Sequence, residues 1–470
     1  IAYDVDVVVI GGSSAGVEAA VAAAEQGASV FLAAERPYLG IDICGTYRLW
    51  LEPDEEPKTA LAEQVFAEPT DVPVFPSSMA FDYEADIDSA DMHKDSATPS
   101  KLRDGRYASA SSESVQYDGD VTIVADLGEE QSVGEVHLLV YQRRSPSQGS
   151  DFEVASVTVS LSDNRKQWRE AAVIENKRAG ESLPEPWGPI DLSAKVSVSA
   201  RYVRFDVKKA EDVERVLLGE IIIADDRPSK AVEESHRPSV AVRPMQVKRV
   251  LDRALLDAGV QFLYGCYATE VLVDQDGHPA GIVMANRSGR QAVRARVVVD
   301  ATARASVARM AGAEFRPYPE GKQTFKRIVI GGEVRDGRGV TGRKLPVVMP
   351  PRNGRSVEAI EYVLEIPMAD GSFESFAKAE QLARDVTWHK DQMDASEVLL
   401  QVPPDSMRSR RAYEKTWRGA DHVDLKALQP AAVARMYVLG GCADVSRQAA
   451  GAMLTPVELM AMGRRVGQAV

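Results

Sequence analysis

The chain has 470 residues and a formal net charge of −14, and 44% of its residues are hydrophobic. This length exceeds what a single hydrophobic core supports, so roughly two or three domains are expected. The acidic balance argues against a nucleic-acid or anionic-membrane surface, and no apolar stretch approaches the roughly 20 residues of a membrane span, so we expect a soluble protein without nucleic-acid partners.

The chain begins at Ile1 rather than Met, so we interpret it as processed or trimmed. A removed signal peptide would make it a secreted or periplasmic protein, and the compartment stays open. Its three cysteines, Cys44, Cys266 and Cys442, predict neither a disulfide framework nor a zinc site. The sequence gives no indication of the oligomeric state.

An apolar strand runs into small residues and then into an alanine-rich helix over residues 6–25. Gly11 allows a tight turn, Ser13 stands where a second glycine is usual, and Gly16 lets helix and strand pack closely. The start of the helix adds free N–H groups and a positive dipole end. The pattern therefore predicts a nucleotide pyrophosphate site formed by Gly11, Gly12, Ser13, Ser14, Ala15 and Gly16.

A second apolar run, residues 28–34, ends at Glu35, where a strand-end carboxylate would hold a ribose diol. Because this carboxylate disfavours a 2′-phosphate, FAD or NAD is expected rather than NADP. Arg36 and Gly40, in the glycine-punctuated loop that follows, are expected as further cofactor contacts.

The character of the chain changes between about residues 77 and 226, where short β-rich runs alternate with turn clusters. Such regular short strands predict an antiparallel sandwich. Alternating helix and strand patterns return from about residue 244, so we interpret the β-rich block as an insertion within a nucleotide-binding fold. Residues 315–425 show mixed patterns.

Three separated segments together resemble FAD-dependent oxidoreductases of the glutathione-reductase-like class. They are the motif at residues 11–16 with Glu35, the run Val-Val-Asp-Ala-Thr at 298–302, and the run Tyr-Val-Leu-Gly-Gly-Cys-Ala-Asp at 437–444. The resemblance implies a bound FAD whose further contacts are Ala268, Ala301, Thr302 and Asp444.

The inserted block resembles a discoidin-like (coagulation factor 5/8 type C) β-sandwich through its runs at 99–105, 125–128, 159–168 and 200–222. This resemblance implies a jelly roll, glycan binding and a structural calcium ion at Asp104 and Glu220, since hard carboxylate oxygens suit that ion. The alternative is that Asp104 shapes a turn and Glu220 caps a strand.

The predicted fold class is therefore α/β, a Rossmann-like FAD-binding domain with an inserted antiparallel β-sandwich and a mixed α+β substrate region. The expected limits are 1–76, 229–315 and 426–470 for the FAD-binding domain, 77–228 for the sandwich and 316–425 for the substrate region.

Flavin carries the difficult chemical step, so the protein must only position a C–H donor and manage one proton. The resemblance brings the loop after Gly40 past the flavin, which makes Arg48 and Tyr47 catalytic candidates, and His389 is the first choice of proton acceptor. Each has a plainer alternative: an ion pair, core packing and a surface histidine, respectively. Cys44 is disfavoured as a redox group because nothing evident activates an isolated loop thiol.

We therefore predict an enzyme that removes hydride from a CH–OH or CH–NH centre of a small molecule, with a carbohydrate or glycoside as the first substrate class by analogy. Two alternatives stay open. One is a glycan-binding protein on a catalytically degenerate flavin fold, and the other is an NAD(P)H-dependent flavin monooxygenase or reductase.

Overall fold

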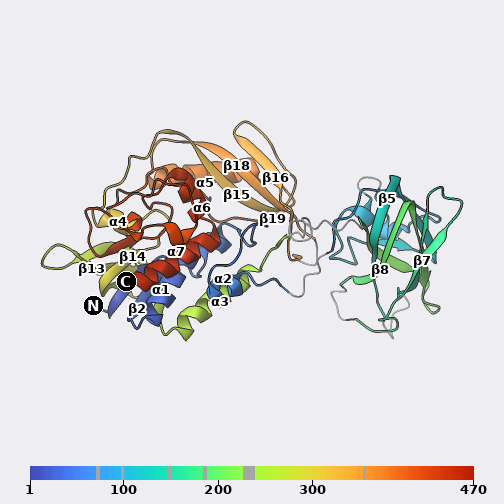
Figure 1. Cartoon of the computed structure of the whole chain (residues 1–470), viewed down its shortest axis with the longest axis horizontal. Coiled ribbons are helices and arrows are strands. Elements are labelled where there is room, and N and C mark those ends of the chain that lie inside the picture. The colour runs from blue at the N-terminus through green and yellow to red at the C-terminus, as the bar shows by residue number, and fades with distance from the viewer. Residues whose placement is uncertain (70–74, 97–99, 145–150, 184–187, 226–238, 353–355) are drawn as a thin grey trace. The chain divides into compact units, whose positions relative to one another are not determined.

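The computed structural model describes residues 1–69, 75–96, 100–144, 151–183, 188–225, 239–352 and 356–470. They form two compact units, shown in Figure 1. The first unit consists of Ile1–Thr70, Ser239–Val348 and Glu358–Val470, and the second of Asp71–Pro238 with Met349–Val357. The expected limit at residue 228 lies outside the described residues, and the segment Met349–Val357, expected in the substrate region, belongs to the second unit.

A mainly parallel sheet forms the centre of the first unit. The second half of valine-rich β1, Val7–Ile10, is completely buried, as expected of a strand covered on both faces. The order is β11-β2-β1-β14, with β20 beside the end of β14 and the antiparallel pair β13-β12 beside its beginning. The strands are β1 (Tyr3–Ile10), β2 (Val30–Ala34), β11 (Gln261–Tyr264), β12 (Tyr267–Val273), β13 (Pro279–Asn286), β14 (Gly289–Asp300) and β20 (Met436–Val438).

Helices α1 (Ser14–Glu25) and α7 (Pro456–Ala469) lie side by side in this unit (Figure 1). Their contact depends on small residues, because a Cβ atom at Gly463 would lie 2.2 Å from the Ala15 carbonyl oxygen. The other helices of the unit are α2 (Ala60–Val65), α3 (Pro244–Asp257), α4 (Ser306–Met310), α5 (Phe373–Thr387) and α6 (Arg447–Met453). Within the described residues, no helix has the length and apolar character needed to cross a membrane.

The region with mixed sequence patterns contains an antiparallel sheet of order β16-β18-β15-β19. Helix α5 covers one face of it, where Phe325 and Val329 pack against Ala379 and Ala383. Since side chains alternate along a strand, the residues between them point to the opposite face. The strands are β15 (Gly321–Gly331), β16 (Val340–Lys344), β18 (Ala359–Met368) and β19 (Gln392–Ala395), and β10 (Ser239–Val240) pairs separately with β17 (Val347–Val348).

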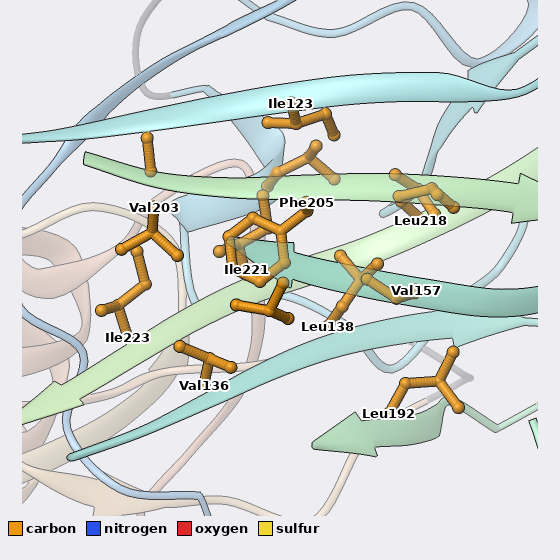
Figure 2. Close-up of a cluster of buried hydrophobic side chains, with 14 of the residues drawn as sticks. Ile123, Val136, Leu138, Val157, Leu192, Val203, Phe205, Leu218, Ile221 and Ile223 are labelled. Carbon is orange, nitrogen blue, oxygen red and sulfur yellow. The ribbon is translucent and has the colours of Figure 1, made fainter. Parts of the chain in front are cut away.

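The second unit contains the predicted antiparallel sandwich, of order β4-β9-β5-β8-β6-β7 with β3 on β5. Long β5 and β8 pair along most of their length through two register shifts, which bend the sheet around its core. Figure 2 shows that core, where Leu138, Phe205 and Ile221 meet. The strands are β3 (Asp82–Ala85), β4 (Val115–Tyr117), β5 (Val121–Tyr141), β6 (Val154–Ser162), β7 (Arg169–Glu175), β8 (Ile190–Lys209) and β9 (Val216–Asp225).

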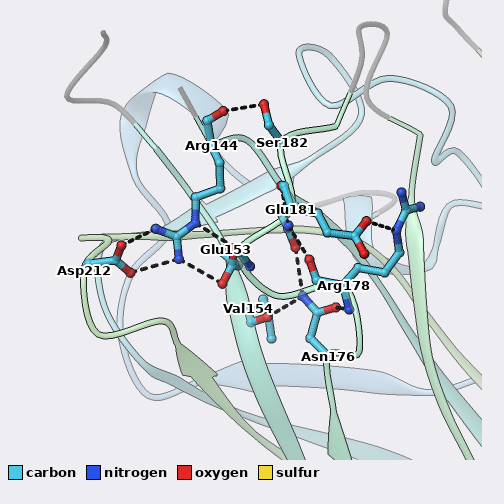
Figure 3. Close-up of polar contacts among 10 residues, drawn as sticks. Arg144, Glu153, Val154, Asn176, Arg178, Glu181, Ser182 and Asp212 are labelled. Atoms are coloured by element: carbon cyan, nitrogen blue, oxygen red, sulfur yellow. Dashed lines mark hydrogen bonds and ion pairs between the residues drawn. The ribbon is translucent and has the colours of Figure 1, made fainter. Parts of the chain in front are cut away.

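A polar network joins three loops of the sandwich (Figure 3). Arg144 donates to Glu153 at 2.7 Å and also to Asp212, while Gly180 N–H donates to the same Glu153 at 2.9 Å. Glu153 is only 1% exposed, so these bonds compensate a charge that would otherwise be costly to bury. The predicted fold class, a Rossmann-like domain with an inserted antiparallel sandwich, is confirmed.

The segment Met349–Val357 satisfies a buried acid of the sandwich. Glu113 is 4% exposed and accepts from Ala108 N–H at 2.8 Å, Ser356 N–H at 2.9 Å and the Ser356 hydroxyl at 3.1 Å. Ser356 thus completes the hydrogen bonding of a carboxylate that belongs to a distant part of the sequence.

Residues 71–238 expressed alone should therefore fold with a β-type far-UV circular dichroism spectrum but with reduced stability. Loss of the Ser356 donors leaves a buried acceptor poorly satisfied, which costs about 1–3 kcal/mol. A synthetic peptide of residues 349–357 should raise the urea midpoint, whereas the same peptide in scrambled order should not. A helical spectrum, or a urea midpoint that the peptide does not change, would contradict this expectation.

Candidate active site

The carboxyl ends of β1 and β14 approach each other very closely. Ala301 N–H donates to the Ile10 carbonyl at 2.7 Å, and a Cβ atom at Gly11 would lie only 2.4 Å from the Ala301 carbonyl oxygen. Gly11 also has a φ of +113°, which favours glycine. The chain continues from β1 to β2 on one side while β14 lies on the other, and ligands bind at such a change of direction in open α/β sheets.

Ser13 has a structural reason to replace the usual glycine. It is the N-cap of α1, and its hydroxyl accepts from Gly16 N–H at 3.1 Å. A Cβ atom at Gly16 would lie 2.8 Å from the Gly11 carbonyl oxygen, so the expected close approach of helix and strand is present.

Glu35 lies at the same edge of the sheet. Ile10 pairs with Ala33, and Glu35 directly follows the end of β2 at Ala34. Burial, and secondarily the charge of Asp300, raise the pKa of the Glu35 carboxyl. The neighbouring Arg36 forms an ion pair with Glu397 at 2.8 Å.

Several other predicted cofactor contacts also have structural roles. Thr302 donates its hydroxyl proton to buried Asp300 at 2.6 Å, and a Cβ atom at Gly40 would lie 2.9 Å from Leu251 of α3. Ala268 lies in β12, opposite Met284. Two residues earlier, Cys266 N–H donates to the Ala34 carbonyl at the end of β2.

The structure places Asp444 in a network of its own. Its carboxylate accepts from Arg316 at 2.8 Å and from both the N–H and the hydroxyl of Ser409 at 2.9 Å. These bonds satisfy the carboxylate of an aspartate that is only 5% exposed, and its expected contact with the flavin stays a prediction.

An open cavity of about 410 Å³ lies in the first unit, between the loop after Cys44, the face of the β15–β18 sheet opposite α5, and α6. Its basic residues are Arg48, Lys326, Arg343 and Arg447, and its acidic residues are Glu52 and Glu361. The remaining lining residues are Thr46, Trp50, Thr324, Ile328, Leu400, Val402, Gly451 and Leu454.

Two of the four basic residues share one carboxylate. Glu361 lies 2.8 Å from Arg343 and 3.5 Å from Lys326. Arg48 instead donates to the Leu454 carbonyl at 3.2 Å. The cavity therefore holds more positive than negative charge.

The structure separates the three catalytic candidates. Arg48 lines the cavity, whereas Tyr47, at a φ of +61°, donates its hydroxyl proton to Asp394. His389 is not among the cavity-lining residues: it packs against Gly332 and lies 3.8 Å from Glu333. Of the three candidates only Arg48 therefore lines the cavity, and the catalytic roles expected of Arg48, Tyr47 and His389 stay predictions.

Cys44 is buried next to the same loop. Burial raises the pKa of this thiol to about 12, and the charge of Lys248 only partly opposes the effect. Burial therefore favours the neutral form of the thiol, which is the less reactive one.

Sequence reasoning missed Lys326, Arg343, Glu361 and Arg447. The signal for Lys326 was present, because Thr324, Lys326 and Ile328 alternate with the buried side chains of a strand. Arg447 and Glu361 come from separate elements, and only the tertiary fold brings them to the same cavity.

The two expected calcium ligands are neighbours in the sandwich. Glu220 is 4% exposed and accepts from Gly105 N–H at 3.2 Å, and Asp104 accepts from Arg106 N–H at 2.9 Å. Burial raises the pKa of Asp104 to about 6 and that of Glu220 to about 9. In the part of the chain that the structure describes, no group of three or more His, Cys, Asp or Glu side chains could hold a metal ion.

Comparison with known proteins supports both resemblances. The family model "FAD dependent oxidoreductase" matches residues 6–68 and 200–327, and the model "F5/8 type C domain" matches residues 86–221. The chain is an FAD-dependent oxidoreductase with an inserted F5/8 type C domain. The two matches overlap at residues 200–221, which the structure assigns to β8 and β9 of the sandwich. No curated protein matches the oxidoreductase.

Solved structures similar to the oxidoreductase have low sequence identity. A geranylgeranyl bacteriochlorophyll reductase-like protein from Thermoplasma acidophilum is 12% identical over 99% of this chain and 77% of that chain, with a TM-score of 0.39. The anhydrotetracycline hydroxylase OxyS from Streptomyces rimosus is 12% identical over 99% and 62%, with a TM-score of 0.36. The lectin domain of lectinolysin is 18% identical over 32% and 94%, with a TM-score of 0.22.

The residues at the β1–α1 turn fit the cofactor of this family. Gly11 leaves the backbone bare where any side chain would collide with Ala301, and Glu35 supplies a carboxylate directly after the end of the neighbouring strand β2. A bare backbone beside a helix start suits a pyrophosphate, and the strand-end carboxylate suits a ribose.

Gly11→Ala should abolish FAD binding, since the new methyl group would displace the Ala301 carbonyl and open the turn. The matched control is Gly27→Ala, which also introduces a side chain at positive φ, +89°, but with no atom within 4 Å. Flavin absorbance per purified chain measures the difference. Equal flavin content in the two variants would contradict a site at this turn.

Proposed function

We propose that this oxidoreductase removes hydride from a CH–OH centre of a small anionic molecule, with an acidic carbohydrate as the first substrate class. The observation that carries the proposal is the cavity beside Arg48, which has four basic residues and two acidic ones. A volume of about 410 Å³ suits a molecule of roughly sugar size.

The basic residues supply the binding energy for an anion. Glu361 forms ion pairs with Arg343 and Lys326, whereas Arg48 donates a hydrogen bond to a backbone carbonyl. Arg48 and Arg447 are therefore the residues to which we assign the substrate anion. The planar donor fork of arginine suits a carboxylate in particular.

The remaining lining residues suit a polyhydroxylated substrate. Thr46 and Thr324 offer hydroxyl groups, and Trp50 and Leu454 give an apolar wall against which the C–H face of a sugar can lie. The presence of an F5/8 type C domain, which the family resemblance associates with glycan binding, supports the same substrate class.

The proton of the oxidised hydroxyl group needs an acceptor. Of the two cavity carboxylates, Glu361 is held by two cations, whereas Glu52 accepts a single bond from Trp50 Nε1 at 3.3 Å. We therefore assign the proton to a Glu52 carboxylate oxygen. Bound FAD, held at the β1–α1 turn, supplies the hydride acceptor.

Anaerobic flavin reduction by a panel of sugars tests this function. Sugar acids such as gluconate and glucuronate should reduce the flavin, and glucose should do so far more slowly. Arg48→Ala and Arg447→Ala should raise KM about 10- to 100-fold, since each removes a charge-assisted bond worth about 1.5–3 kcal/mol. Glu52→Gln should lower the limiting rate about 100-fold with FAD still bound.

The control for these variants is Arg253→Ala, which removes an exposed arginine that pairs with Asp257 outside the cavity. It should behave as the unmodified protein does. Two results would contradict the proposal: neutral sugars that reduce the flavin as fast as sugar acids do, or an Arg48→Ala variant with unchanged KM.

A structural calcium ion at Asp104 and Glu220 is a second proposal, for the sandwich. The half-buried carboxylate of Asp104 and the buried carboxylate of Glu220 repel each other, and calcium accepts backbone carbonyls as well as carboxylates as ligands. Millimolar calcium should therefore raise the thermal midpoint of the full chain by several degrees relative to EDTA, while magnesium should have little effect. The shift should disappear in Asp104→Asn, and equal midpoints with and without calcium would contradict the proposal.

A further inference from the structure

The N-terminus of α1 is already bound to an anion of the chain itself. Ser14 N–H donates to Asp42 Oδ1 at 2.7 Å, and the Ser14 hydroxyl donates to Asp42 Oδ2 at 2.5 Å. Ser13 takes the next available donor, Gly16 N–H. Two of the first three N–H groups of the helix are thus engaged by the chain's own side chains.

Backbone bonds fix Asp42 in this position. Gly40 N–H donates to the Gly12 carbonyl at 2.7 Å, which fastens the loop to the glycine-rich turn. Gly40 then reverses the chain at a φ of +77°, and the Thr46 hydroxyl donates to the Asp42 carbonyl at 2.5 Å. The carboxylate therefore faces the helix start because of the loop's own geometry.

A pyrophosphate would need the same donors. The site for FAD rests on the family match and on the bare backbone at Gly11, and Asp42 lies within the matched residues 6–68. Two like charges within a few ångströms at one helix end repel each other strongly in a partly buried site. The Asp42 carboxylate and the pyrophosphate of FAD therefore compete for Ser14.

We propose that the Asp42 carboxylate competes with the pyrophosphate of FAD for the donors of Ser14. FAD then binds only when this carboxylate releases Ser14 or takes up a proton. The inference rests on the assignment of FAD to this turn. It makes Asp42 a residue that determines cofactor affinity, and it predicts that FAD binding is coupled to proton uptake.

The charged and titratable groups near Asp42 are few. On its own loop these are Arg48, whose charge favours the ionised carboxylate, and Cys44, which lies close enough to feel the carboxylate's charge. Lys248 of α3, the other helix packed on this loop, faces Cys44. Burial raises the pKa of the Asp42 carboxyl and outweighs both the hydrogen bonds from Ser14 and the charge of Arg48, so a proton is gained more readily here than on an exposed aspartate.

The test measures the Kd of FAD for the flavin-free full chain as the pH is lowered, by quenching of flavin fluorescence. For the unmodified chain, the Kd should decrease as the pH is lowered, because the protonated Asp42 carboxyl group no longer repels the phosphates. Asp42→Asn should bind FAD about tenfold more tightly at neutral pH and should lose this pH dependence. ADP, which carries the same pyrophosphate, should follow the same pattern, while riboflavin, which lacks it, should not.

Two further variants keep the result interpretable. Asp42→Ser should reproduce the tighter binding if the amide of Asp42→Asn disturbs the loop, and Asp4→Asn, which neutralises an exposed carboxylate paired with Arg294 on β1, should bind as the unmodified chain does. Equal or weaker FAD binding by both Asp42 variants would overturn the inference while leaving the cofactor assignment intact. Absence of FAD binding in every variant would overturn both.

Discussion

The architecture of the first unit depends on one close backbone approach, between Gly11 at the end of β1 and Ala301 at the end of β14. Segments nearly 300 residues apart in sequence meet there with no side chain between them. The approach sets the start of α1, and through the bond from Gly40 to Gly12 it also sets the loop that carries Asp42 and Arg48. The predicted nucleotide site and the cavity are therefore positioned by the same few backbone atoms.

Sequence patterns were sufficient where local chemistry alone decides the structure. The strand-turn-helix at residues 3–25 and the inserted strands follow from the alternation of apolar residues and from glycine positions, and the structure has them at the expected places. A strand covered on both faces, such as β1, also has an unmistakable valine-rich composition.

The candidate site was less accessible from sequence because it is assembled from distant segments. Arg48 was found because a recognisable loop carries it, whereas Arg447 and Glu361 have no local pattern that connects them to it. His389 was chosen for its chemistry, and it is not among the residues that line the cavity. Asp444 is predicted at the cofactor by resemblance alone, and its hydrogen-bond partners within the chain, Arg316 and Ser409, come from a region whose patterns were mixed.

Alternate residues of strand β15 have different roles. Phe325 and Val329 hold α5 and cannot change without loss of the core, while Thr324, Lys326 and Ile328 point into the cavity and carry none of that packing. Related proteins could therefore exchange one ligand preference for another by substitutions at alternate positions of a single strand, with the fold unaffected. If substrate binds in this cavity as we propose, the specificity of the enzyme and its stability can evolve separately, although the two sets of residues are direct neighbours in the chain.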